Sequence, residues 1–240
     1  MVSHADPSPP SSAQPVTFTI DGIVRGIRRI APLSAFALPF GVAYGAASVE
    51  QGMAAWQALL ASGTIFAGAS QFAALELWQD PMPLISITLV VLAVNARHII
   101  LGAALSPWLN RLPPGRWFLA LCMLTDVTFA DSHAAFKGGE RDAGILLGGG
   151  LLMWTAWMIG TTIGAIAGTS LGDLDRFGLD VVMMSFFAAI VVGSLKSRAA
   201  VWPVIIASLM ALATLPLLPA GWNIIVAALV GGGVGALRRD

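Results

Sequence analysis

The chain has 240 residues, of which 57% are hydrophobic and only 11% are charged, and its mean hydropathy is +0.80. A soluble domain usually carries about 25% charged residues, and a chain of this size must still cover a water-exposed surface with polar groups. We therefore expect lipid to contact much of the surface. Lys and Arg number 13, as do Asp and Glu, so the net charge gives no attraction to nucleic acid. The single cysteine, Cys122, excludes an intrachain disulfide and a cysteine-based zinc site.

The first 20 residues differ in composition from the rest of the chain. They contain no Lys or Arg, and prolines stand at positions 7, 9, 10 and 15. A secretory signal needs a basic start and an unbroken apolar stretch. Residues 1–20 are therefore expected to form a disordered cytoplasmic tail.

Eight apolar segments follow, and crossing a bilayer as a helix takes about 20 mostly apolar residues. The segments lie near 29–48, 56–78, 83–106, 116–136, 143–168, 178–195, 199–217 and 221–237. Short connections join them and leave no room for a soluble domain. The expected fold is all-α, a polytopic membrane helical bundle in which residues 21–240 form a single transmembrane domain.

Basic residues near segment ends favour the cytoplasmic side of a membrane. With eight crossings and both termini in the cytoplasm, that side receives Arg25, Arg28, Arg29, Lys137, Arg141, Lys196, Arg198, Arg238 and Arg239. The outside receives Arg111, Arg116 and Arg176, and the first two fit this arrangement poorly. A re-entrant or broken segment among the first three would alter the count, so seven crossings remain an alternative.

Two stretches about 120 residues apart resemble each other, one at 39–47 and one at 159–167. Both carry glycines at close spacing in an apolar segment. Internal repeats of this kind are common in secondary transporters. The alternative is that the glycines serve helix packing alone, since small residues four apart let helix backbones approach closely.

The first polar interruption, Asn95-Ala96-Arg97-His98, falls about midway through the third segment. Charged groups inside a membrane are costly unless paired or hydrated, so they are candidates for function. Arg97 can face a substrate carboxylate or an intramembrane Asp, and His98 can titrate near neutral pH and relay a proton. The alternative is a shorter segment, from which Arg97 reaches the membrane surface.

The fourth segment carries the second interruption, with Asp126 and Asp131. Asp126 lies far from the nearest basic residues in the sequence and is expected to be deep. A pair between Asp126 and Arg97 would neutralise both charges. Such a pair is either a coupling element that opens and reforms or a static structural contact.

The third interruption is the stretch from Ser62 to Phe72, which includes Gly68, Ser70 and Gln71. Its small and polar residues favour a helix break, where freed backbone N–H groups can meet an anionic group. Ser70 and Gln71 can hydrogen-bond the ammonium or the carboxylate of a substrate. The alternative is a tight helix crossing held by polar side chains.

Common enzyme motifs are missing from the sequence. It contains no G-x-x-x-x-G-K-[ST] phosphate loop, no H-E-x-x-H metal motif and no G-x-S-x-G nucleophile motif. We expect no cofactor and no metal, and a membrane-embedded enzyme is disfavoured.

Taken together, these motifs resemble the AzlC family, the large subunit of bacterial branched-chain amino acid exporters. The resemblance covers roughly residues 20–240. It rests on Pro39-Phe-Gly with Tyr44-Gly, Phe66-Ala-Gly-Ala-Ser-Gln-Phe72, Asn95-Ala-Arg-His98 with Ser106-Pro107, Thr125-Asp126 with Phe129-Ala130, and Gly178-Leu-Asp180.

The resemblance implies ion-driven export of valine, leucine, isoleucine or similar amino acids across the bacterial cytoplasmic (inner) membrane. It also implies a small hydrophobic partner subunit of the AzlD family. The family usually has Thr-Asp-Glu in the fourth segment, and Val127 replaces the Glu here. Proton coupling would then rest on Asp126, Asp131 or His98.

The leading hypothesis is thus an amino acid exporter. Substrate binding is assigned to Arg97, Asn95, Ser70, Gln71 and Gly68, and proton coupling to Asp126, His98 and Asp131. The alternatives are a membrane subunit that scaffolds a partner without transporting, and a permease for a different small solute.

Overall fold

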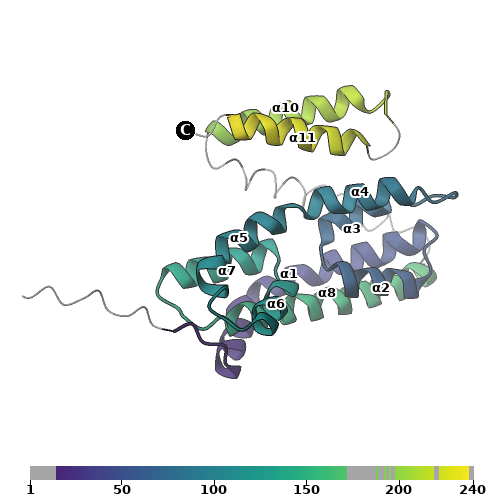
Figure 1. The fold of residues 1–240 in the computed structure, drawn as a ribbon. Coiled ribbons are helices and arrows are strands. Elements are labelled where there is room, and N and C mark those ends of the chain that lie inside the picture. The colour runs from purple at the N-terminus through teal and green to yellow at the C-terminus, as the bar shows by residue number, and fades with distance from the viewer. Residues whose placement is uncertain are drawn as a thin grey trace, which may run out of the picture. The chain divides into compact units, whose positions relative to one another are not determined.

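The computed structural model describes residues 15–171, 198–218 and 222–237, together with Ala188, Val192 and Leu195. In this part of the chain the regular structure consists of helices and one isolated β-bridge, which confirms the all-α prediction (Figure 1). The helices are α1 (Ile20–Glu50), α2 (Ala55–Ile65), α3 (Gly68–Leu75), α4 (Leu84–Asn95), α5 (Arg97–Leu109), α6 (Pro114–Cys122), α7 (Asp126–Lys137), α8 (Gly144–Leu171), α10 (Arg198–Thr214) and α11 (Trp222–Leu237).

The chain divides into two compact units, which are described separately. Unit 1 comprises residues 1–31 and 101–152, and unit 2 comprises residues 32–100 and 153–240. The boundaries fall inside α1, α5 and α8, so these helices contribute to both units.

Three helical stretches are long and apolar enough to cross a membrane: Ile20–Glu50, Leu84–Leu109 and Gly144–Gly168. Large apolar side chains on the second stretch are exposed, including Leu92 at 61% and Ile99 at 76%. Such surfaces are unfavourable in water and suit contact with lipid. The apolar helices Val201–Thr214 and Trp222–Leu237 are shorter. A polytopic helical membrane protein is confirmed.

The second and fourth expected crossings are each broken into two short helices. The longest of the four, α7, has 12 residues, or about 18 Å at 1.5 Å per residue. None of them alone reaches across a hydrocarbon core of about 30 Å. The sixth expected segment, 178–195, lies almost entirely outside the described residues, so neither eight crossings nor seven is confirmed.

In unit 1 the α6–α7 segment turns back on itself. Trp108 on α5, which precedes α6, stacks on Phe136 near the end of α7 with a ring-centroid distance of 5.3 Å. Leu112 and Ala143, which flank the segment on either side, belong to the same buried core. The chain therefore enters and leaves α6–α7 at the same place in the unit, as a re-entrant segment does.

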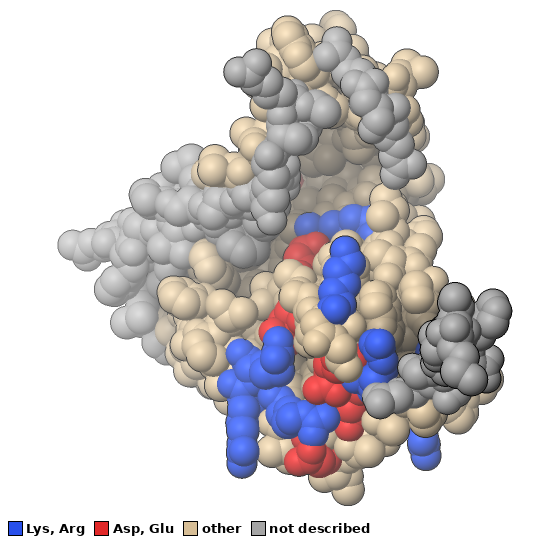
Figure 2. Space-filling view, turned by 90° about the vertical axis from the view of Figure 1, so that its left-hand side faces the viewer, with Lys and Arg blue, Asp and Glu red and all other residues tan. Residues whose placement is uncertain are grey.

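This arrangement changes the expected position of two basic residues. Arg111 and Arg116 precede or begin α6, and Lys137 and Arg141 end or follow α7. Because the segment turns back, its two ends adjoin, and these four residues belong to those ends. If the segment crossed the membrane, the first two residues would lie on the opposite side from the last two. Figure 2 shows a face of the molecule on which basic and acidic side chains gather.

Glycines allow α1 and α8 to lie in direct contact. In unit 2 a Cβ built on Gly160 would lie 2.4 Å from the Leu38 carbonyl oxygen, and one on Gly164 would lie 2.0 Å from that of Val42. In unit 1 a Cβ on Gly148 would lie 2.0 Å from the Ile23 carbonyl oxygen. The contacts advance together along both helices, which therefore run parallel. The two similar stretches, 39–47 and 159–167, thus pack against each other, as the packing alternative predicted; whether they are also a repeat stays a prediction.

Residues 15–19, which precede α1, lie within the described part of the chain. Thr17 forms a β-bridge with Asp142: its N–H donates to the Arg141 carbonyl at 2.8 Å, and its carbonyl accepts from Ala143 N–H at 2.9 Å. Val16 and Phe18 pack against the unit 1 core. The tail predicted to be disordered therefore does not extend to residue 20, and residues 1–14 lie outside the described part.

Helices α10 and α11 pack as an antiparallel pair (Figure 1). A Cβ on Gly231 would lie 2.8 Å from the Ala207 Cβ, and one on Gly235 would lie 3.6 Å from the Pro203 Cγ. Small residues again bring two backbones close together.

Candidate functional site

The break between α2 and α3 is the most irregular backbone among the described helices of unit 2. Phe66 ends α2 in the left-handed region, with φ 41° and ψ 46°, and Ala67 precedes α3 with φ −145° and ψ 89°, outside the helical region. Left-handed backbone is unfavourable for a bulky residue, and such strain concentrates at functional sites. The helix break predicted for the Ser62–Phe72 stretch is therefore present.

A buried hydrogen-bond network surrounds this break, with Ser62 on α2 at its centre. The Ser62 hydroxyl lies 3.1 Å from Gln71 Nε2, 3.2 Å from Trp157 Nε1 and 2.9 Å from Thr161 Oγ1. Ser62, Gln71 and Thr161 are at most 1% exposed. Because the indole and amide nitrogens can only donate, the Ser62 hydrogen is left for Thr161. The network joins α2, α3 and α8.

Aromatic side chains enclose the network. Tyr44 on α1 stacks on Trp157 with centroids 6.0 Å apart and meets Phe72 edge-on at 5.5 Å. A Cβ on Gly68 would lie 2.9 Å from the Trp157 ring, so glycine is needed at the start of α3 for this ring to approach. The polar groups thus sit in apolar surroundings, where hydrogen bonds are strong and unpaired groups are costly.

A second link connects α3 to α4. Ser70 Oγ donates to the Ala67 carbonyl at 2.9 Å and accepts from Asn95 Nδ2 at 3.1 Å. His98 Nδ1 lies 3.2 Å from the Asn95 carbonyl oxygen. Because a carbonyl oxygen can only accept, Nδ1 carries the hydrogen in this contact. The structure therefore brings together Ser70, Asn95 and His98, three of the residues singled out in the sequence.

Arg97 begins α5 and is half-buried. It lies near the middle of the 26-residue apolar stretch Leu84–Leu109. The apolar run thus continues on both sides of Arg97, as expected for a position in the middle of the third segment. The alternative of a shorter third segment is not supported.

The two acidic candidates, Asp126 and Asp131, belong to unit 1, whereas Arg97 belongs to unit 2. Asp126 is the first residue of α7 and is exposed on the surface of the protein. Its depth in the membrane stays a prediction. Thr125 caps this helix by accepting from the Thr128 N–H at 3.2 Å. The pairing of Asp126 with Arg97 stays a prediction.

Asp131 forms a two-pronged ion pair with Arg29 on α1. Arg29 Nη2 lies 2.7 Å from Oδ1, and Arg29 Nε lies 2.9 Å from Oδ2. The Arg29 side chain is 45% exposed and that of Asp131 is 19% exposed. This geometry ties α7 to α1, and Asp131 would have to leave the guanidinium before it could carry a proton.

Asp142, which carries no motif in the sequence, holds the start of α1 and of α8. Its carboxylate accepts from Thr19 N–H at 3.1 Å, from the Thr19 hydroxyl and from Gly144 N–H at 2.9 Å, and Arg25 Nη2 lies 3.4 Å away. Burial raises the pKa of the Asp142 carboxyl, but the hydrogen bonds from Thr19 and Gly144 and the charge of Arg25 outweigh it, so the pKa lies below its ordinary value of 3.8. Two helix N-termini also favour an anion here.

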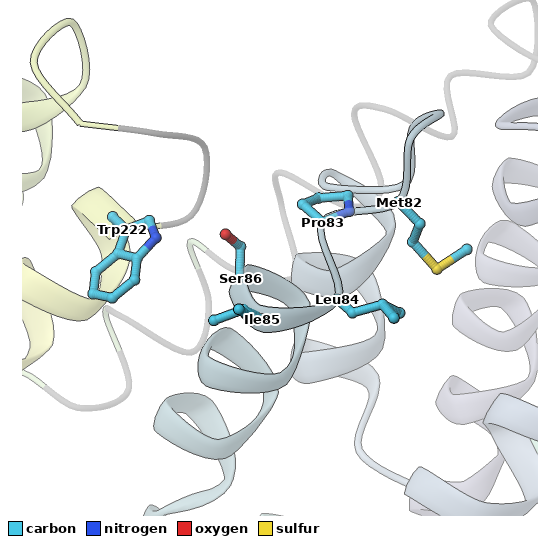
Figure 3. Close-up of a pocket in the computed structure, with 6 residues that line it drawn as sticks. All are labelled: Met82, Pro83, Leu84, Ile85, Ser86 and Trp222. Carbon is cyan, nitrogen blue, oxygen red and sulfur yellow. The ribbon is translucent and has the colours of Figure 1, made fainter.

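An open pocket of about 600 Å³ lies elsewhere in unit 2, at the start of α4 (Figure 3). Its lining consists of Met82, Pro83, Leu84, Ile85, Ser86 and Trp222. None of the predicted site residues lines it, and its side chains are mostly apolar. We therefore place the candidate site at the α2–α3 break.

Some members of the candidate site were missed or given no role from the sequence, namely Tyr44, Trp157 and Thr161. Trp157 and Thr161 were read as part of an apolar segment, although a tryptophan and a threonine away from segment ends are a usable signal. Among the described residues, no group of three or more His, Cys, Asp or Glu side chains is arranged to hold a metal ion.

Comparison with known proteins identifies the family. A family model described as AzlC protein matches residues 32–171. The branched-chain amino acid transport protein AzlC of Bacillus subtilis is 28% identical over 160 residues, which cover 66% of this chain and 62% of that protein. Inner membrane protein YgaZ of Escherichia coli is 28% identical over 168 residues, covering 69% and 66%. An uncharacterized membrane protein of Archaeoglobus fulgidus is 33% identical over 164 residues, covering 67% and 70%.

No solved structure matches the chain. The matched regions span about two thirds of the length of these relatives. Because the family model covers more than half of the sequence, the chain belongs to the AzlC family.

Proposed function

We propose that this chain is a secondary transporter that exports branched-chain or similar small amino acids across the bacterial inner membrane, together with a small AzlD-like subunit. Family membership and the name of the Bacillus subtilis relative support transport of this substrate class. The observation that carries the proposal is the broken α2–α3 segment, where a buried polar network lies among apolar helices. Transporters commonly bind substrates at such discontinuous helices.

In this proposal the substrate binds beside the break. Arg97 pairs with the substrate carboxylate, because a guanidinium offers two parallel donors to a carboxylate. Gly68 and the N-terminus of α3 add backbone N–H donors. Asn95, Ser70 and Gln71 complete the lining with hydrogen-bonding side chains.

Proton coupling is assigned to Asp126, His98 and Asp131. His98 can exchange a proton at Nε2 while Nδ1 remains bonded to the Asn95 carbonyl. Asp126 stands in the Thr-Asp pattern that the family shares, and Val127 takes the place of the usual Glu. The ion pair with Arg29 makes Asp131 the weakest of the three candidates.

The orientation follows from basic residues in unit 1. Exposed side chains of Arg28, Arg29, Arg111, Arg116 and Lys137 all belong to this unit. Basic loops favour the cytoplasm, which supports a cytoplasmic position for this part of unit 1. Both termini are likewise assigned to the cytoplasm.

The test is efflux from an export-deficient bacterial host that expresses the chain with its small subunit. We expect release of valine, leucine or isoleucine, and Arg97→Ala should lower it by about tenfold or more, since a hydrogen bond to a charged group contributes about 1.5–3 kcal/mol. The matched control, Arg116→Ala, removes an exposed Arg from unit 1 and should leave efflux unchanged.

Membrane levels of both subunits must be measured in parallel. Loss of efflux at normal levels supports the transporter. If Arg97→Ala removes the small subunit from the membrane, and the wild type shows no efflux either, the chain acts instead as a scaffold. Release of another solute but not of these amino acids would indicate a different permease.

A further inference from the structure

Two amide oxygens beside the helix break are buried without a hydrogen-bond donor among the described protein groups, Gln71 Oε1 and Asn95 Oδ1. Gln71 is 1% exposed, and Asn95 is half-buried. A buried acceptor that lacks a donor is costly and needs an explanation.

The orientation of the Asn95 amide follows from its neighbour. The Ser70 hydroxyl has one hydrogen, which it donates to the Ala67 carbonyl. Ser70 can therefore only accept from Asn95, which must present its Nδ2 group. Oδ1 is consequently turned away from Ser70, and a flipped amide would lose this hydrogen bond.

The orientation of Gln71 follows in the same way. Its Nε2 group donates to Ser62, and the amide also interacts with the Tyr44 phenol. The Ser62 hydrogen is left for Thr161, because Trp157 and Gln71 both donate to its oxygen. Ser62 therefore gives no hydrogen to Gln71, and Gln71 Oε1 is left without a donor.

Two oxygens that can only accept require a ligand that can donate hydrogen bonds. An ammonium group has three N–H donors and no acceptor, whereas a carboxylate has no hydrogen to give. We infer that Asn95 Oδ1, with Gln71 Oε1 in support, binds the α-ammonium group of the transported amino acid. This inference rests on the proposed function and names the part of the substrate that these residues recognise.

The neighbouring residues complement this assignment. Asn95 and Arg97 flank the exposed Ala96, so one short segment offers an acceptor oxygen and a guanidinium. The site then discriminates against acids that lack the amino group, because they would leave buried oxygens unpaired.

The test is Asn95→Asp, which keeps the shape of the side chain and adds a negative charge. The full-length chain, reconstituted with its small subunit in lipid nanodiscs, is titrated with leucine, with isopentylamine (leucine without its carboxylate) and with 4-methylpentanoate (leucine without its amino group). Binding is measured by calorimetry. The matched control is Asn110→Asp on an exposed turn of unit 1.

We expect Asn95→Asp to raise the affinity ratio of amine to acid by about tenfold or more, because a charge-assisted hydrogen bond is roughly twice as strong as a neutral one. Asn110→Asp should leave the ratio unchanged. If Asn95→Asp does not fold, Gln71→Glu undergoes the same titrations with the same expectation.

Three results overturn the inference. An unchanged ratio with normal leucine binding by the wild type would mean that the oxygens hold only a buried water. If Asn95→Asp shifts the affinity ratio toward 4-methylpentanoate, the two oxygens face the carboxylate of the substrate. Failure of the wild type to bind leucine would refute the proposed function itself, and the inference would fall with it.

Discussion

Replacing Gly164 with Ala tests the parallel contact between α1 and α8 directly. A Cβ at this position would lie 2.0 Å from the Val42 carbonyl oxygen and 2.9 Å from the Ala46 nitrogen. Both contacts are with backbone, so no side chain can rotate away, and the helices must separate by about 1 Å or more. Overpacking of this kind costs about 1–3 kcal/mol. For a chain of this size we expect Tm to fall by about 2–12 °C, at about 2–4 °C per kcal/mol.

Gly232→Ala is the matched control, because a Cβ on Gly232 in α11 would meet nothing within 4 Å. Alanine in an open helix position is favoured over glycine by about 0.5–1 kcal/mol, so its Tm should stay the same or rise slightly. Unfolding is followed by thermal denaturation of the full-length protein in one detergent, monitored by size-exclusion chromatography. The reasoning is refuted if both variants melt with the wild type, or if both lose the same number of degrees.

Three further predictions concern unit 1. Asp142→Asn should lower the free energy of unfolding by about 2 kcal/mol at pH 7, since it removes hydrogen bonds to a charged group. Because the pKa of Asp142 is lowered in the folded state, its stabilising effect is present above the unfolded-state pKa of about 4 and is lost as the pH falls through the folded-state pKa. The Tm difference between the variant and the wild type should therefore narrow below about pH 4. Asp131→Asn should change Tm little, because an exposed ion pair such as that with Arg29 contributes about 0–1 kcal/mol; loss of efflux at unchanged Tm would assign Asp131 to coupling, and retained efflux would exclude it. Single cysteines replacing Arg111 and Lys137, in a chain without its native cysteine, should be labelled by an impermeant thiol reagent from the same side of the membrane; labelling from opposite sides would show that α6–α7 crosses.

Several local features were predictable from the sequence because they depend on neighbours along the chain. The low charge content indicated lipid contact, and the apolar runs around Arg97 placed it near the middle of a long helix, as found. The small and polar residues after Ser62 indicated a helix break, which Phe66 and Ala67 form. Each of these conclusions needs only the local balance of apolar, polar and small residues.

The path of α6–α7 was not predictable in this way. A helix that crosses and a broken segment that turns back have similar hydropathy, because both bury apolar residues at the same depth. The stacking of Trp108 on Phe136 and the shared core position of Leu112 and Ala143 separate the two possibilities. The poor fit of Arg111 and Arg116 to an eight-crossing arrangement was the sole sequence signal of this difference.

The role of each polar residue was decided by partners far away in the sequence. Ser62 and Thr161 meet across 99 positions, and Thr19 and Asp142 across 123. No local pattern encodes such pairings, because they depend on how helices distant in the sequence pack against each other. The sequence by itself therefore determined that the chain is a helical membrane protein with a break after Ser62. Only the tertiary structure decided which hydroxyl, amide and indole groups surround that break, because the shared burial of distant segments fixes their hydrogen-bond partners.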